Sequence, residues 1–168
     1  MTGFDDYARS TEAPMAPSDR FDSLFRCFAE WDRSPVTRRW ERRPRPLDWT
    51  LLKRQALAES GLDADAKSRV GALGLSQFMP ATWAEWARTQ QPTALMLLDP
   101  RDPEDAIWAQ ADYLAWLLDA FQGDVRKAIA AYNWGIGNIK RLVRDHGEQW
   151  ETQLPDETRH YLARILGL

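Results

Sequence analysis

Apolar residues recur along most of the chain at intervals of three and four, the spacing of one face of an α-helix. The spacing predicts helices over about 18–31, 48–60, 80–89, 103–122, 124–134, 138–146 and 156–166. Asp48 and Asp102 are placed as N-caps, and Gly61, Gly123 and Gly147 as helix stops. No segment shows the alternation of period two that a half-buried strand requires. The pattern therefore predicts an all-α protein.

The first 46 residues differ in composition from the rest. A polar arm leads to a helix capped by Ser18, and six arginines then fall within residues 33–45, interrupted by prolines. Because proline breaks a helical stripe of arginines, we interpret this run as a solvated linker. Nucleic-acid binding is the alternative, but a sequence pI near 5.4 argues against it. We predict an N-terminal extension over 1–46 and one helical domain over 47–168.

Overall composition fits an ordinary globular protein. The chain has 168 residues, of which 44% are apolar and 28% charged, with a net charge of −3. No apolar run approaches the roughly 18 residues of a membrane span, and no signal peptide is visible at the N-terminus. Cys27 is the single cysteine and is expected to be packed, and His146 and His160 lack metal-ligand spacing. We expect a monomer with no metal and no cofactor.

Nine tryptophans are an unusual number for this length. Their rings can build a core or line a groove for flat ligands such as sugars. We expect most of them in the core, and Trp83 and Trp86 at the border of a sugar cleft.

One carboxylate is predicted on the apolar face of a helix. Leu52, Ala56 and Glu59 are spaced four and three apart, so Glu59 points toward a core or a cleft wall. Desolvation and the negative end of the helix dipole both disfavour the charged form, and they raise the pKa above its usual value of about 4.3. Such an acid can protonate a glycosidic oxygen. A Glu at the helix margin that reaches water is the alternative.

Two further segments have the composition of ligand-binding loops. GALGLSQFMPATW has glycines among small and apolar residues, and AYNWGIGNIKR places Tyr132 and Asn133 at a helix end before two glycines. A phosphate-binding loop is excluded, because no Lys-Ser or Lys-Thr follows the glycines.

Four ordered blocks resemble the motif series of the soluble lytic transglycosylase family. The blocks are Glu59-Ser60, residues 71–80 (GALGLSQFMP), Ala131-Tyr132-Asn133, and residues 157–161 (ETRHY). The resemblance covers residues 47–168 and implies a lysozyme-like helical fold of the goose type and an enzyme that cleaves peptidoglycan. Ser76 departs from the family pattern, which usually has Met there, so we expect altered packing at the substrate site and preserved chemistry.

The resemblance also implies residue roles. Glu59 would be the catalytic acid and base, with Ser60 supporting it through a hydrogen bond. Gln77 and Met79 match positions that line the glycan cleft, and Tyr132 and Asn133 match its floor. Tyr161 matches a tyrosine near the catalytic acid, and Glu157 a position that contacts substrate in some members. The expected binding residues are Ser60, Gln77, Met79, Tyr132, Asn133, Glu157 and Tyr161.

The family's chemistry needs a single carboxylate and yields a 1,6-anhydro sugar without water. A hydrolytic muramidase is the alternative if Asp63 or Asp65 enters the cleft to activate a water. A non-catalytic wall-binding protein is a further alternative, which the presence of Glu59 disfavours. With no export signal visible, we expect release through phage lysis, or a component of a virion. A bacterial protein with an unrecognised export route is the alternative.

Overall fold

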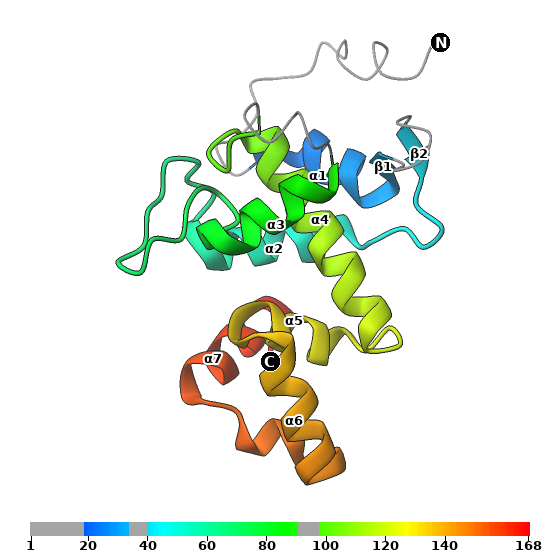
Figure 1. The fold of residues 1–168 in the computed structure, drawn as a ribbon, viewed down its shortest axis with the longest axis vertical. Coiled ribbons are helices and arrows are strands. Elements are labelled where there is room, and N and C mark those ends of the chain that lie inside the picture. Colours follow the sequence, from blue (N-terminus) through cyan, green and yellow to red (C-terminus); the bar gives the residue numbers. More distant parts are fainter. Residues whose placement is uncertain (1–18, 34–39, 91–97) are drawn as a thin grey trace.

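A computed structural model describes residues 19–33, 40–90 and 98–168 of the chain. Within these ranges the elements α1–α4 form the upper part of the molecule and α5–α7 the lower part, with α4 running from one to the other (Figure 1). The helices are α1 (Asp22–Glu30), α2 (Trp49–Ser60), α3 (Pro80–Gln90), α4 (Pro103–Ala120), α5 (Val125–Trp134), α6 (Ile136–His146), the 3₁₀ helix η2 (Gly147–Gln153) and α7 (Asp156–Leu166).

The helical prediction is confirmed apart from one hairpin. Strands β1 (Trp31–Arg33) and β2 (Trp40–Arg42) pair antiparallel, with Trp31 opposite Arg42. The prediction that the chain has no strand is therefore wrong at this point. Strands of three residues are too short for alternation to appear in a sequence, and the arginines there do not signal a strand.

The predicted caps account for several of the helix ends. Asp48 accepts a hydrogen bond from the Thr50 amide (2.8 Å) at the start of α2, and Gly61 ends that helix in the left-handed region, with φ 69°. Asp102 and Asp124 cap α4 and α5 in the same way. Three boundaries differ by two residues or more: α1 begins at Asp22 instead of near Ser18, α6 begins two residues before the predicted 138, and α4 ends at Ala120 instead of reaching Gly123. Ser18 lies outside the described residues.

The core lies where α1, α2, α4, α5 and α7 meet. Helix α1 packs against α2 and α4 and contributes Phe25 and Phe28, both almost completely buried. Trp83 and Trp86 are also buried, each 8% exposed, and their rings lie 5.0 Å apart. The expectation that these two rings border an open cleft is wrong, because they continue a row of aromatic contacts inside the upper part of the molecule through Trp108.

The arginine-rich segment is not a solvated linker throughout. Arg43 is 8% exposed and forms an ion pair with Asp112 of α4 at 2.6 Å, and its Nε donates to the Phe28 carbonyl oxygen. Arg42 and Arg45 lie at the surface, paired with Glu30 and Asp119. The solvated interpretation fails at Arg43, because an acid 69 positions away in sequence provides a buried partner.

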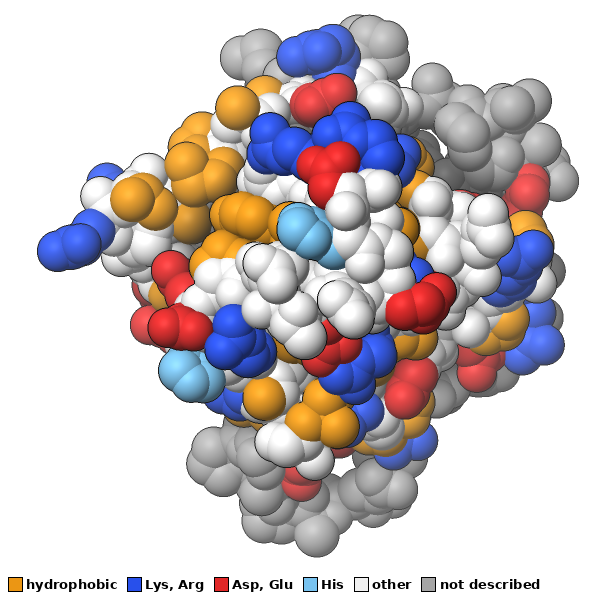
Figure 2. Space-filling model, turned by 90° about the horizontal axis from the view of Figure 1, so that it is seen from below, with side chains coloured by type: hydrophobic (Ala, Val, Ile, Leu, Met, Phe, Trp, Pro, Cys, Tyr) orange, Lys and Arg blue, Asp and Glu red, His pale blue; other side chains and the backbone are white. Residues whose placement is uncertain are grey.

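Acidic and basic side chains are interspersed on the face of the molecule seen from below (Figure 2). Among the helices of the described ranges, none combines the length and the apolar character needed to cross a membrane.

Candidate active site

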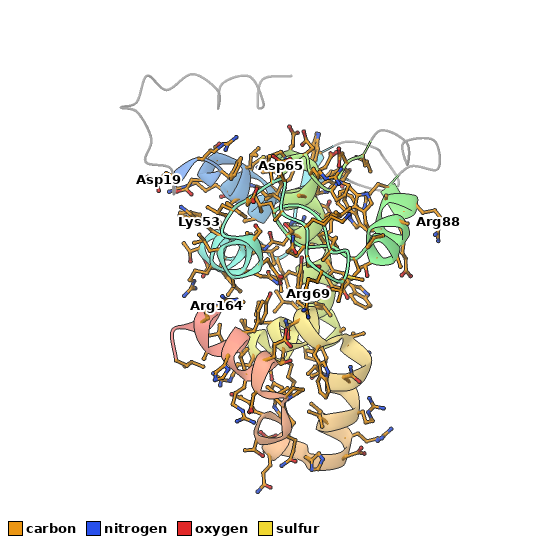
Figure 3. All side chains as sticks on the ribbon, turned by 90° about the vertical axis from the view of Figure 1, so that its left-hand side faces the viewer. Asp19, Lys53, Asp65, Arg69, Arg88 and Arg164 are labelled. Atoms are coloured by element: carbon orange, nitrogen blue, oxygen red, sulfur yellow. The ribbon has the colours of Figure 1, made fainter. Side chains whose placement is uncertain are left out.

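Glu59 lies in the last turn of α2, where α7 packs against it. The Tyr161 hydroxyl of α7 donates a hydrogen bond of 2.5 Å to Glu59 Oε1. One turn further along α7, Arg164 Nη2 donates to the Ala58 carbonyl oxygen at 2.7 Å, and Figure 3 shows Arg164 at the end of α7 nearest α2. Glu59 is partly buried, so its carboxyl group is fixed by α7 while part of its surface stays accessible.

Burial is the largest influence on this carboxyl group. It raises the pKa of Glu59 to about 7, while the hydrogen bond from Tyr161 and the charge of Arg164 act in the opposite direction. Burial and the nearby Glu59 also raise the pKa of Tyr132 and Tyr161 well above the usual value, so both phenols stay protonated. The predicted rise in the Glu59 pKa is confirmed. At neutral pH this carboxyl group can both give and take a proton.

The glycine-containing loop 61–79 is held by its own backbone hydrogen bonds. Leu73 and Phe78 exchange two of them, and the Gly74 amide donates to the Ala66 carbonyl oxygen at 2.9 Å. Gly74 has φ 73°, and a Cβ atom at this position would lie 1.7 Å from the carbonyl oxygen of Pro100. Only glycine fits so close to another backbone, which explains the residue type. The loop therefore has a fixed shape next to α4.

The predicted binding residues of this loop differ in exposure. Gln77 has φ 50°, and its side-chain amide donates to the carbonyl oxygens of Gly74 (2.8 Å) and Ala66 (3.3 Å). Gln77 therefore holds the loop together. Met79 is 43% exposed immediately before α3 and is free to contact a ligand.

Ser60 does not make the bond that the resemblance implied. Its hydroxyl donates to the Leu75 carbonyl oxygen at 2.8 Å and accepts from the Asp63 amide at 3.1 Å. The structure therefore assigns Ser60 to fastening the loop onto the end of α2, and no hydrogen bond joins it to Glu59.

The remaining predicted residues lie on α5 and α7. Tyr132 donates to the Ser76 carbonyl oxygen at 3.2 Å, which ties α5 to the loop. Asn133 is exposed, and its Oδ1 accepts from Thr158 Oγ1 at 2.8 Å. Glu157 is exposed in the first turn of α7, one turn before Tyr161. The structure thus brings Tyr161 directly to Glu59 and leaves Glu157 at the surface.

Two groups near the site were missed by sequence reasoning. Gln55 and Gln110 are completely buried and hydrogen-bonded to one another, and Gln55 reaches the Tyr161 hydroxyl. One feature of the sequence could have indicated that Gln55 lies near the site: it precedes Glu59 by four residues and therefore shares its helix face. The second group is a row of rings: Tyr113 packs edge-on against Tyr132 at 5.3 Å, and the half-exposed Trp116 stacks on Tyr113 at 5.5 Å.

The two acids that follow Glu59 do not join it. Asp63 and Asp65 are exposed, and Asp63 Oδ1 accepts from the Asp65 amide in a local turn. Figure 3 shows Asp65 on the part of the loop away from Arg164. The described part of the chain also contains no cluster of three or more His, Cys, Asp or Glu side chains arranged to hold a metal.

The chain is similar to several known proteins. The chain is similar to the membrane-bound lytic murein transglycosylase F of Pasteurella multocida (36% identity; 60% of this chain, 20% of that protein). It is also similar to the peptidoglycan transglycosylase gp16 of Escherichia phage T7 (34%; 71% of this chain, 9% of that protein). The chain therefore spans a fifth or less of the length of these relatives.

Solved structures show the same fold. The 70 kDa soluble lytic transglycosylase Slt70 of Escherichia coli superposes with a TM-score of 0.66 at 25% identity, over 91% of this chain and 23% of that one. An inactive mutant of the lytic transglycosylase Slt of Pseudomonas aeruginosa gives a TM-score of 0.59 at 30% identity, over 71% of this chain and 20% of that one. The predicted lysozyme-like helical fold is confirmed.

The family match covers most of the described structure. The profile of the transglycosylase SLT domain matches residues 37–154, which include Glu59, the glycine-containing loop and Tyr132, and which end before α7. The match covers the first three motif blocks, and the fourth block, at residues 157–161, lies beyond it. The resemblance to this family is confirmed, and the chain belongs to the transglycosylase SLT domain family.

Proposed function

We propose that the protein is a peptidoglycan lytic transglycosylase. It cleaves the β-1,4 bond between N-acetylmuramic acid and N-acetylglucosamine and leaves a 1,6-anhydro-muramic end, with Glu59 as the one acid and base. The observation that carries this proposal is a partly buried carboxyl group with a pKa of about 7 whose Oε1 accepts from Tyr161.

The first step uses the neutral form of Glu59. Its proton passes to the glycosidic oxygen, the bond from that oxygen to C1 of the muramic sugar breaks, and the N-acetylglucosamine side leaves as an alcohol. The muramic sugar becomes an oxocarbenium-like cation, which its own N-acetyl group stabilises. Tyr161 continues to donate to Oε1 and stabilises the new carboxylate.

The second step uses the carboxylate. Glu59 removes the proton of the C6 hydroxyl while that oxygen bonds to C1, so the carboxylic acid is restored and no water is consumed. Nucleophile and electrophile belong to one sugar ring, and such proximity is worth about 7–11 kcal/mol in favourable cases. A second carboxylate is not required, which fits the exposed positions of Asp63 and Asp65.

Several residues are proposed to hold the glycan. Met79 and Asn133 present exposed surface. Tyr132 lies close enough to Glu59 for that charge to raise the pKa of its phenol, and the ring of Trp116 extends the row of rings that starts at Tyr132. Ser60, Gln77 and Tyr161 fix the loop and the helix ends around the glycan. Glu157 offers an exposed carboxylate in the first turn of α7 for contact with substrate.

The test is mass spectrometry of the soluble fragments released from purified peptidoglycan. We expect fragments that end in 1,6-anhydro-muramic acid, and none from Glu59→Gln. Glu148→Gln changes an exposed acid of the lower part and serves as the matched control, with fragment release like that of the wild type. Ordinary reducing muramic ends would show a hydrolytic muramidase, and no fragments at all would leave a wall-binding protein.

A phage setting is proposed on the similarity to the phage T7 peptidoglycan transglycosylase. In this setting the enzyme opens the wall during lysis. Proteomics of purified virions tests the proposal: peptides of this chain at a fixed stoichiometry would identify a virion component instead of a free lytic enzyme.

A further inference from the structure

A buried row of polar side chains leads from the loop through the core to Glu59. Ser76 Oγ lies 3.0 Å from Gln110 Oε1, Gln110 Nε2 lies 3.0 Å from Gln55 Oε1, and Gln55 Nε2 lies 3.4 Å from the Tyr161 hydroxyl. Tyr161 then donates to Glu59 Oε1. The first three side chains are completely buried, and Tyr161 is 5% exposed. Four segments of the chain thus contribute to one connected network.

The direction of the donors from Gln110 to Glu59 is set at Leu52, while the Ser76 hydroxyl lies within reach of two acceptors, Gln110 Oε1 and the Ala106 carbonyl oxygen. Gln110 Nε2 also lies 2.9 Å from the Leu52 carbonyl oxygen, which can only accept. The amide of Gln110 therefore points its NH₂ group toward α2, and its second N–H donates to Gln55 Oε1. This places the NH₂ group of Gln55 toward Tyr161, whose oxygen accepts. The phenolic hydrogen is left for Glu59.

We propose that Gln55 and Gln110 are positioning residues for the acid: they hold the Tyr161 hydroxyl as a donor to Glu59 Oε1, so that the transferable proton stays on Oε2. The inference rests on the proposed function of Glu59. An acid that protonates a glycosidic oxygen must present its proton on one defined oxygen, and the fixed donor at Oε1 selects the other.

Other groups face Glu59 as well. Tyr161 and Arg164 approach it from α7, and Tyr132 of α5 lies close enough to sense its charge. Tyr132 is fixed through the Ser76 carbonyl oxygen, and Ser76 also donates at the far end of the row. Along the row, the two glutamines reach Glu59 through the phenol of Tyr161 and make no contact with Arg164, so their effect is separable from that of Arg164.

The network also explains why two amides are retained in an apolar core. Burying a polar group is unfavourable unless it is paired, and replacing both partners of such a pair by apolar side chains of similar size can be nearly neutral for stability. Stability alone does not require the pair. Accepting a hydrogen bond strengthens a hydroxyl as a donor, so Gln55 reinforces the bond from Tyr161 to Glu59.

The experiment compares Gln55→Met, Gln110→Met and the double variant. Titration of the ¹³C-labelled carboxyl carbon of Glu59, assigned by its loss in Glu59→Gln, reports the Glu59 pKa without any substrate. Initial rates of fragment release report kcat and KM. Ile107→Val, a conservative change in the core face of α4 one turn before Gln110, is the matched control for general weakening of the core.

We expect Gln55→Met to raise the Glu59 pKa and to lower kcat about tenfold, with KM changed less than about twofold. The double variant leaves neither amide unpaired, so it regains thermal stability while the raised pKa and the low kcat persist. In a Tyr161→Phe background, Gln55→Met has no further effect. Ile107→Val should leave the Glu59 pKa and kcat unchanged.

An unchanged Glu59 pKa in Gln55→Met, or a full effect of Gln55→Met in the Tyr161→Phe background, would overturn the positioning role. If Gln55→Met does not fold, Ser76→Ala breaks the row at its far end with little change in volume, and a smaller rise of the pKa is expected. A wild-type protein that releases no fragments yet shows these shifts would refute the proposed function and leave the network intact.

Discussion

Replacing Glu59 by Gln should make the protein more stable, and the gain should grow with pH. The folded protein holds the Glu59 proton with a pKa of about 7, against an ordinary value of 4.5. Between these values the folded state binds the proton that the unfolded state has released, so stability falls as pH rises from about 4.5 through 7. A difference of this size corresponds to about 3 kcal/mol of unfolding free energy. The amide side chain of the Glu59→Gln variant cannot ionise and still accepts from Tyr161, so the variant avoids this loss.

The measurement is urea unfolding of the wild type and of Glu59→Gln at several values between pH 4 and pH 8. Other groups titrate in both proteins and cancel in the difference. The unfolding free energy of Glu59→Gln minus that of the wild type should be at its low-pH baseline at pH 4 and should increase by about 3 kcal/mol by pH 8. Glu148→Gln, which changes an exposed acid, should show a flat difference. A flat difference for Glu59→Gln would refute the claim that burial raises the pKa of this carboxyl group.

Three further changes test other parts of the structure. Gly74→Ala should lower the unfolding free energy by more than Gly71→Ala does. Both glycines have positive φ, which costs an alanine roughly 1–2 kcal/mol, but only a Cβ at 74 also meets the Pro100 carbonyl oxygen. Thermal unfolding of the two variants measures how much more stability Gly74→Ala loses. Arg43→Met should lower stability by about 3–5 kcal/mol, because the buried Asp112 loses its cationic partner and keeps only the hydrogen bonds from Trp86 and Gln90. Arg42→Met at the surface should change stability by less than about 1 kcal/mol in urea titrations. Trp116→Ala should raise KM for glycan fragments up to about tenfold with kcat retained, as aromatic contacts are worth about 0.5–1.5 kcal/mol; a fall in kcat alone would contradict a binding role.

Local sequence patterns were sufficient to predict the helices and the candidate acid. The caps at Asp48 and Gly61 fix α2, and the spacing from Leu52 to Glu59 fixes the face on which the carboxylate lies. Hairpin strands of three residues, by contrast, have no periodicity to read. Their formation depends on packing against α1 and on the burial of Arg43, whose partner Asp112 lies 69 residues further along the chain.

The polar groups around the site could not be predicted for the same reason. Gln55 and Gln110 are 55 residues apart, and an isolated glutamine in a helix ordinarily faces water. The resemblance gave the Ser60 hydroxyl the wrong partner, because in the structure this hydroxyl donates to the loop carbonyl oxygen of Leu75. A side chain's neighbour in sequence is only one of its possible partners, and tertiary contacts decide between them.

The surroundings of Glu59 meet two opposite demands of the proposed reaction. A general acid must keep its proton until the glycosidic oxygen needs it, and burial of the carboxyl group provides this. The same group must then exist as a carboxylate long enough to act as a base, which burial alone would oppose. Tyr161 and Arg164, both on α7, supply the donor and the positive charge that stabilise the anion and bring the pKa back to about 7. If one residue performs both steps, as proposed, its pKa must lie near the working pH, and α7 is the element that adjusts it.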